Sequence, residues 1–492
     1  MEADALTNSM PTAFRRGVVA MTAANAVALA MVIISYILYS RLMTPAEFGI
    51  YAGALAIAKL GTTVLDGGLK IALVKHHDTV APGVLRALFL GSMGASILAV
   101  LLLVTVVATL ATLNLLEAGN AFFFALYGAA YFLTYPLLFI PLAQLERAQR
   151  YTPVARAETL SISIEYALPA LLWLMVAPGF WSFILAAWIA RGLRTSLMLA
   201  ASDDRAWLPR GSTPQWHEAK ALLREGLGLQ LAVSLSMLRD NIHLLLVGPW
   251  FGKEWAGLYA WALQLCAVAS QVFVQTASRV ALPALRLTKG MDSRWKATLT
   301  QITWLTIFTA PPLVFLTDIA HVANEALFDS KWTVALGLLP FLIVRMLPGL
   351  ATTPLGSLVL AERDARAYAV ANAWWTGGEV VVAATMLWLY GPIGLAWSYA
   401  FMAWLGVAAF VRQLPLPARF ISLLPPLLLR PSLWVAVLLV LVYRWAVVHH
   451  GLGSDLKSIC LYSAIGTLVC IMIEQRCRQA LLPLTFKRAP LE

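Results

Sequence analysis

Several charged residues lie near the middle of long apolar stretches: Lys59, Glu165, Arg239, Arg345 and Glu379. A charge at the centre of a membrane span costs about 2.5–3.5 kcal/mol on insertion scales, so it usually marks a transport pathway or a paired partner. An arginine keeps its proton, and its forked donors fit two phosphate oxygens. We therefore predict that Arg239 and Arg345 bind phosphate, with Lys59 as a third positive charge.

The acidic residues in the same stretches suggest a second kind of chemistry. A carboxylate in a partly dry cavity has a raised proton affinity and can exchange H⁺ or Na⁺ as a transporter changes conformation. The candidates for such ion coupling are Asp66, Glu165, Asp240 and Glu379. Helical spacing places Asp66 on the same face as Lys59, so this face is expected to line a hydrated cavity.

The alternative is that these charges neutralise one another and hold the helices together. On this interpretation the pairs are Lys59 with Asp66, Arg239 with Asp240 or Glu379, and Arg345 with Glu165. A whole layer of buried charges still favours a hydrated lumen, because apolar contacts would hold helices at a lower cost.

Uncharged polar residues follow one face of the stretch centred near Leu265. Gln264, Gln271 and Gln275 recur there at helical spacing. Amide groups both donate and accept hydrogen bonds, which matches sugar hydroxyls. The pattern predicts sugar contacts, and interhelical hydrogen bonding is the alternative.

Composition determines the protein class. Of the 492 residues 60% are hydrophobic and 12% are charged, against about 45–50% and about 25% in soluble domains. This excess indicates an integral membrane protein and disfavours a soluble enzyme. The net charge of +11 is then a signal of membrane topology rather than of nucleic-acid binding. The four cysteines show no metal-binding spacing, and we expect no metal, cofactor or catalytic residue.

Counting apolar runs long enough to cross the bilayer predicts about 14 transmembrane helices in an all-α, polytopic fold. Their expected centres are Leu29, Leu60, Ala95, Tyr131, Glu165, Ala190, Leu238, Leu265, Ile307, Arg345, Val380, Met402, Leu438 and Ser463. Basic residues, with Arg191 and Arg194 counted among them, gather in the loops of one side. Cytoplasmic loops collect lysine and arginine, so both termini are expected in the cytoplasm.

An internal repeat supports a division into halves. Residues 47–55 match residues 255–263 in sharing glycine, tyrosine, alanine and leucine at the same positions. Because an even number of helices separates the copies, the two six-helix lobes are parallel repeats. We predict an N-terminal lobe over 1–200, a cytoplasmic linker over 201–224, a C-terminal lobe over 225–412, and an additional helix pair with a tail over 413–492.

The segment from Arg41 to Tyr51, followed by Asp66 to Leu69, resembles the start of bacterial polysaccharide transporters. These are the lipid-linked oligosaccharide flippases of the superfamily that also contains multidrug extruders and lipid II flippases. The stretch from Asp240 to Leu263 resembles the seventh and eighth helices of the same family. The resemblance implies two lobes around a central cavity that opens alternately to the two sides of the membrane.

The resemblance also implies the cargo, an undecaprenyl-diphosphate-linked oligosaccharide carried across the bacterial inner membrane for polysaccharide or lipopolysaccharide biosynthesis. Arg239, Arg345 and Lys59 would then bind the diphosphate. Expected partners are the lipid bilayer, H⁺ or Na⁺, and a polysaccharide polymerase or export machinery, with no nucleic acid. Two alternatives remain: a cation-coupled exporter of small molecules from the same superfamily, and a membrane-embedded glycosyltransferase or polymerase.

Overall fold

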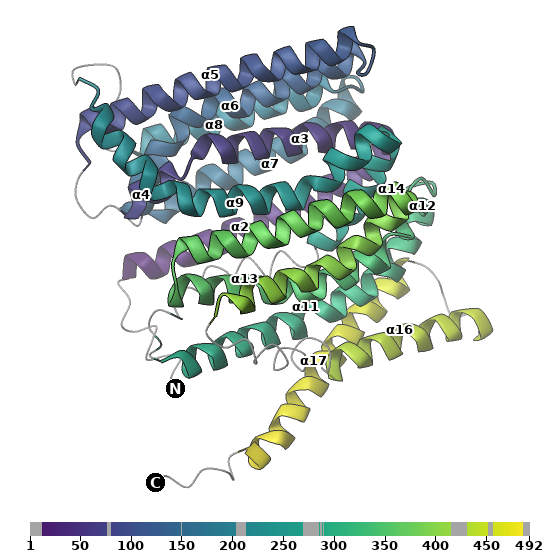
Figure 1. Ribbon diagram of the computed structural model, residues 1–492. Coiled ribbons are helices and arrows are strands. Elements are labelled where there is room, and N and C mark those ends of the chain that lie inside the picture. The colour runs from purple at the N-terminus through teal and green to yellow at the C-terminus, as the bar shows by residue number, and fades with distance from the viewer. Residues whose placement is uncertain are drawn as a thin grey trace, which may run out of the picture. The chain divides into compact units, whose positions relative to one another are not determined.

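The computed structural model describes residues 12–75, 80–148, 150–202, 213–268, 285, 288, 290–414, 431–450 and 456–485. Within these ranges every regular element is a helix (Figure 1). The helices are α2 (Thr12–Leu42), α3 (Pro45–Asp66), α4 (Leu69–Lys75), α5 (Pro82–Thr112), α6 (Ala118–Arg147), α7 (Tyr151–Met175), α8 (Trp181–Ala201), α9 (Trp216–Phe251), α11 (Met291–Leu327), α12 (Thr333–Leu336), α13 (Leu339–Glu362), α14 (Ala365–Arg412), α16 (Pro431–His450) and α17 (Leu456–Thr485). Residues 253–268 are also helical.

Each of the fourteen predicted span centres lies within a helix. The 48-residue α14 contains two of them, Val380 and Met402, because its backbone breaks at Gly391. That residue has φ 65° and ψ −156°, a conformation that glycine adopts without a steric penalty, and Pro392 follows it. The predicted all-α, polytopic fold is confirmed.

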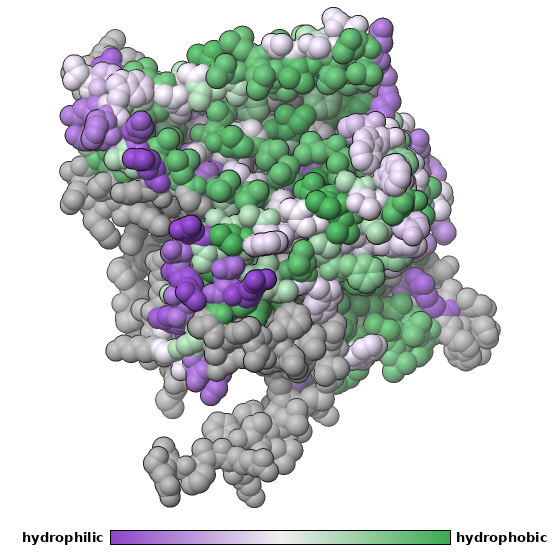
Figure 2. Space-filling model, viewed as in Figure 1, coloured by the Kyte–Doolittle hydropathy of each residue, from purple (hydrophilic) through white to green (hydrophobic). Residues whose placement is uncertain are grey.

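The outer surfaces of the helices suit a lipid environment. Among the described residues, eight helices are long and apolar enough to cross a membrane. In α5 only 11% of the most apolar window is buried inside the protein, and Leu98, Leu101 and Leu102 are exposed. Figure 2 shows hydrophobic residues over much of the visible face. Such exposure is stable only if lipid tails cover it, so the chain is a multi-pass membrane protein.

The chain forms two compact units. The first comprises Met1–Met43 and Glu47–Leu245. In it α7 packs against α2 and α8, and α6 packs against α5 and α8. Its tyrosines and phenylalanines form a packed group that includes Tyr39, Tyr51 and Phe183.

The second unit comprises Thr44–Ala46 and Leu246–Glu492. Its main core lies between α11, α13 and α14 and includes Ile302, Leu355 and Phe410. The two last helices, α16 and α17, pack against α11 around the buried Phe315. An ion pair of 2.6 Å between Arg444 and Asp318 joins α16 to α11.

The two units divide within α9, between Leu245 and Leu246. The first turns of α9 belong to the first unit because Ala219 and Leu222 are buried against residues of α4, α5 and α6. The lobe boundaries expected from the sequence, with a linker over 201–224, stay a prediction, and residues 203–212 lie outside the described residues.

Two glycines allow α9 to approach the turn before α4. Gly68 has φ +79°, and its backbone lies directly against that of Gly226 in α9. A Cβ atom added to Gly226 would lie 2.5 Å from the carbonyl oxygen of Gly68 and 3.0 Å from its Cα. Near this contact, the amide nitrogen of the Gln230 side chain donates to the carbonyl oxygen of Thr63. Only glycine at both positions permits this packing.

We predict that Gly226→Ala destabilises the protein, because the added methyl group forces the two backbones apart. The expected loss is about 1–3 kcal/mol, as for other overpacked sites, measured as a lower thermal unfolding temperature of purified protein in detergent. Gly94→Ala is the control, since nothing lies within 4 Å of a Cβ at that position in α5. Equal unfolding temperatures for the Gly226→Ala variant and the wild type would contradict the proposed tight contact.

Candidate functional site

A buried cluster of three side chains joins α6, α7 and α8. The Nη2 atom of Arg191 lies 2.7 Å from Oε2 of Glu165, and these side chains are 17% and 6% exposed. The hydroxyl of Tyr131 donates to Oε1 of the same glutamate. The guanidinium carbon of Arg191 lies 3.8 Å from the centroid of the Tyr131 ring. The arginine is thus held by a carboxylate at its edge and an aromatic ring at its face.

A second ion pair lies next to this cluster on the same two helices, α7 and α8. Glu158 lies two turns before Glu165 on α7, and Arg194 lies one turn after Arg191 on α8, so each set shares a helix face. Arg194 and Glu158 form an ion pair of 2.6 Å. The Nε atoms of Arg191 and Arg194 are buried, and neither has an acceptor among the described residues. These donors are suited to a water molecule or an anionic ligand.

The second unit contains a corresponding cluster. The Nη2 atom of Arg345 in α13 lies 3.5 Å from Oε1 of Glu379 in α14. These side chains are 11% and 1% exposed. The guanidinium carbon of Arg345 lies 4.3 Å from the centroid of the Tyr399 ring, beyond the break in α14. The structure therefore brings together two residues that the sequence analysis assigned to different roles.

The two clusters occupy equivalent places in the predicted repeat. Each uses the fourth, fifth and sixth helices of its half, and the acid lies on the fifth. In both halves the residue on the fourth helix precedes that acid by 34 residues. The arginine and the tyrosine have exchanged helices: tyrosine precedes the acid in the first half, and arginine precedes it in the second. A glutamate held by an arginine that packs on a tyrosine ring is therefore common to both halves.

Arg239 lies on α9 and is buried. Its Nη2 atom donates to the hydroxyl of Ser236 at 2.8 Å, and its Nε atom lies 3.6 Å from Oδ1 of Asp240. The Asp240 side chain is 56% exposed. His243, one turn further along the helix, is also buried. This group contains one predicted phosphate ligand and one predicted ion-coupling residue.

The remaining predicted site residues are Lys59, Asp66, Gln264, Gln271 and Gln275. Lys59 is exposed on α3. Asp66, at the end of α3, accepts a hydrogen bond from the hydroxyl of Tyr135. Gln264 is half-buried in the helix over residues 253–268. Gln271 and Gln275 lie outside the described residues.

The predicted neutralising pairs are correct in part. The pair of Arg239 with Asp240 is confirmed. The pairing of Arg345 with Glu165 stays a prediction, because the two residues belong to different units; within their own units Arg345 lies against Glu379 and Glu165 against Arg191. The pairing of Lys59 with Asp66 is wrong, since the partner of Asp66 is the Tyr135 hydroxyl.

Sequence reasoning missed Arg191 as a residue of the site. Counting it with the loop arginines was wrong, because it lies in the middle of α8, a helix apolar enough to span the membrane. Its position next to Ala190, the predicted centre of that span, is a signal that could have identified it. Arg194, one turn further along, is also inside α8.

Comparison with protein families gives a match over much of the chain. The profile of the family described as polysaccharide biosynthesis protein matches residues 38–336. The teichuronic acid biosynthesis protein TuaB of Bacillus subtilis (strain 168) is 23% identical over 426 residues, which cover 82% of this chain and 84% of that protein. The succinoglycan biosynthesis transport protein ExoT of Rhizobium meliloti (strain 1021) is 25% identical over 313 residues, covering 61% of this chain and 60% of that protein.

Solved structures share the fold at low sequence identity. The lipid II flippase MurJ in an inward closed conformation gives a TM-score of 0.67 with 13% identity, covering 93% of this chain and 98% of that one. An inward-facing transporter of the multidrug resistance MATE family gives a TM-score of 0.53 with 13% identity, covering 80% and 94%. These similarities show that the chain shares the fold of these structures.

We predict that Arg191→Ala strongly destabilises the protein, because it leaves the buried Glu165 carboxylate without its charged partner. Breaking a buried ion pair costs about 3–5 kcal/mol, so the thermal unfolding temperature in detergent should fall. The double variant Arg191→Ala/Glu165→Gln should recover part of the loss. Arg156→Ala is the control, since Arg156 is exposed on α7. No difference between Arg191→Ala and this control would refute the assignment.

Proposed function

We propose that this chain, which belongs to the polysaccharide biosynthesis protein family, is a flippase that moves a lipid-linked oligosaccharide across the membrane by alternating access. The named relatives act in teichuronic acid biosynthesis and succinoglycan transport. The fold is that of a lipid II flippase structure. The chain is a transporter rather than an enzyme.

The observation that carries the mechanism is the buried pair of Arg345 and Glu379. At 3.5 Å the contact is longer than a close charge-assisted hydrogen bond of about 2.7–2.9 Å. A guanidinium that rests on the Tyr399 ring presents its edge to an anion. A diphosphate that reaches this pair would compete with Glu379 for that edge. Arg345 is therefore the leading phosphate ligand, and Arg239 and Lys59 are assigned to the same headgroup.

Competition for the arginine also provides ion coupling. When phosphate occupies Arg345, the Glu379 carboxylate loses its counter-charge in a buried place, which favours uptake of H⁺ or Na⁺. Glu165, the equivalent acid of the first half, is held more closely by Arg191 and Tyr131. We assign the exchangeable ion to Glu379, with Asp66, Glu165 and Asp240 as further candidates.

The remaining assignments concern cargo and location. The cargo is an undecaprenyl-diphosphate-linked glycan, and Gln264, Gln271 and Gln275 contact its sugars. The protein resides in the bacterial inner membrane with both termini in the cytoplasm, as the distribution of basic loop residues favours. It delivers its glycan to a polymerase or export machinery. Export of cationic small molecules is the second candidate, favoured by the fold shared with a multidrug transporter.

We predict that Arg345→Ala reduces surface polysaccharide by about 10–100-fold, the range expected for one lost charge-assisted contact. Lipid-linked precursor should accumulate, and surface glycan is compared per amount of protein in the membrane, because losing Arg345 also leaves the buried Glu379 without its charged partner. The measurement is surface glycan and precursor in a strain that depends on the variant. Arg366→Ala is the control, because Arg366 is exposed near the start of α14.

The exchanged variant Arg345→Glu/Glu379→Arg separates binding from structure. It keeps an ion pair between the two helices, so the protein should fold, but it moves the cation to the other helix. We expect export to stay low. Full restoration of export by the exchange would show that the pair is only structural. Cation export lost in Glu379→Gln with normal surface glycan would instead favour the small-molecule exporter.

A further inference from the structure

Tyr259 is a fully buried residue outside the charged clusters. It lies in the helix over residues 253–268, within the repeated motif over 255–263. Its hydroxyl donates a hydrogen bond to the backbone carbonyl oxygen of Pro392. Pro392 directly follows the break in α14 at Gly391. The hydrogen bond therefore connects a separate helix to the point where the second segment of α14 begins.

The break leaves the direction of this second segment, residues 392–412, to tertiary contacts. Gly391 departs from helical φ and ψ, so the axis of the preceding segment does not continue into the second one. Gly394 lies so close to the preceding segment that a Cβ atom there would clash with the carbonyl oxygen of Met386. The two segments thus pack directly against each other at the break, and Tyr259 is bound to the first residue beyond it.

The helix that carries Tyr259 is itself held by aromatic packing. The rings of Trp261 and Trp332 are stacked, with centroids 5.0 Å apart and an interplanar angle of 4°. The Phe328 ring meets Trp261 edge-on at 6.4 Å. The backbone N–H of Trp332 donates to the side-chain oxygen of Asn324 in α11 at 2.9 Å. Tyr259 therefore connects the break to a helix that is fixed by its packing at the end of α11.

Helical spacing relates this contact to the second charged cluster. Pro392, Ala396 and Tyr399 follow one another at +4 and +3, so they share one face of α14. The Tyr399 ring is fully buried, and its centroid lies 4.3 Å from the guanidinium carbon of Arg345. A tilt of about 10° at Pro392 would move Tyr399, about 10 Å further along the axis, by about 2 Å. Such a displacement is large enough to lose the contact between ring and guanidinium.

The first unit contains a similar contact at the equivalent tyrosine. Tyr51 occupies the position of Tyr259 in the repeated motif, and its ring lies 4.6 Å from that of Phe183 near the start of α8. The sequence separation between Tyr51 and Tyr259 equals that between Arg191 and Tyr399. In each half the repeated tyrosine thus contacts the sixth helix about two turns before the residue that enters the charged cluster.

We propose that Tyr259 is a positioning residue, whose hydrogen bond to Pro392 sets the direction of the second segment of α14 and keeps the Tyr399 ring against Arg345. Its effect on export rests on the proposed function, in which Arg345 binds the phosphate of the cargo. Loss of the hydroxyl weakens that binding without removing any group that touches the cargo, because the ring that supports the guanidinium is displaced.

The geometry is tested by pulsed electron paramagnetic resonance on full-length protein in nanodiscs. Spin-labelled unnatural amino acids replace Val344, next to Arg345 on α13, and Phe401, near Tyr399 on α14. Both side chains are exposed, by 47% and 73%, so the labels should not disturb the packing. Tyr259→Phe keeps the ring and removes only the hydroxyl. It should shift the maximum of the distance distribution by about 2 Å or broaden the distribution by a similar amount.

Tyr390→Phe is the matched control. Tyr390 directly precedes the break and is exposed, so loss of its hydroxyl should leave the distance distribution as in the wild type. The thermal unfolding temperature of both variants is measured in the same nanodiscs, and folded protein is expected in each case because the aromatic ring is kept.

A double-mutant cycle on export tests whether Tyr259 acts through Tyr399. Tyr259→Phe should lower surface glycan, per amount of protein in the membrane, by about three- to tenfold, the range of one hydrogen bond. Tyr399→Leu should lower it at least as much. The double variant should export no less than Tyr399→Leu alone, because the ring that Tyr259 positions is already missing. A purely structural role of the hydroxyl would instead multiply the two losses.

Two results would overturn the proposal. An unchanged distance distribution in Tyr259→Phe would show that the hydroxyl does not direct the second segment of α14. Multiplied losses of export in the double variant would show that Tyr259 does not act through Tyr399. A wild-type gene that fails to restore surface glycan would refute the flippase proposal, and the distances would still decide whether Tyr259 positions Tyr399.

Discussion

The cost of burying charge in apolar helices is the constraint on which this structure depends. Each half of the protein meets it in the same way, with a glutamate and an arginine from neighbouring helices in contact and a tyrosine ring against the guanidinium. Such clusters contribute little to the stability of the fold, because apolar residues of similar volume often stabilise helix packing equally well or better. Their presence in both halves supports the proposed transport of a charged cargo.

The two clusters differ in a way that fits this explanation. In the first half the ion pair is short, and a second pair, Arg194 with Glu158, continues it along the same helices. In the second half the contact between Arg345 and Glu379 is longer. The break at Gly391 separates the helix that carries Glu379 from the segment that carries Tyr399. These differences support the proposal that the second cluster is the one that exchanges partners.

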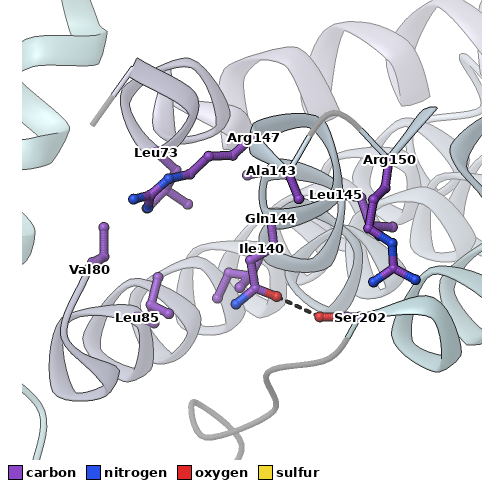
Figure 3. A pocket seen from close by; sticks show the side chains of 11 residues that line it. Leu73, Val80, Leu85, Ile140, Ala143, Gln144, Leu145, Arg147, Arg150 and Ser202 are labelled. Atoms are coloured by element: carbon purple, nitrogen blue, oxygen red, sulfur yellow. Dashed lines mark hydrogen bonds between the residues drawn. The ribbon is translucent and has the colours of Figure 1, made fainter. Parts of the chain in front are cut away.

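The outer surface of the first unit must also match its surroundings. A chain with exposed leucines along α5 is stable only in contact with hydrocarbon. At one end of the first unit, Arg147 and Arg150 line a pocket together with apolar side chains (Figure 3).

By itself the sequence determined the membrane class, the helical fold and the positions of the spans, because these depend on local hydrophobicity and on the length of apolar runs. It also marked Glu165, Arg345 and Glu379 as unusual. Tertiary structure alone decided which charges meet within each unit: Glu165 binds Arg191, and Arg345 binds Glu379. Ion pairing depends on which helix faces pack together, and that choice is made by contacts between residues far apart in the chain.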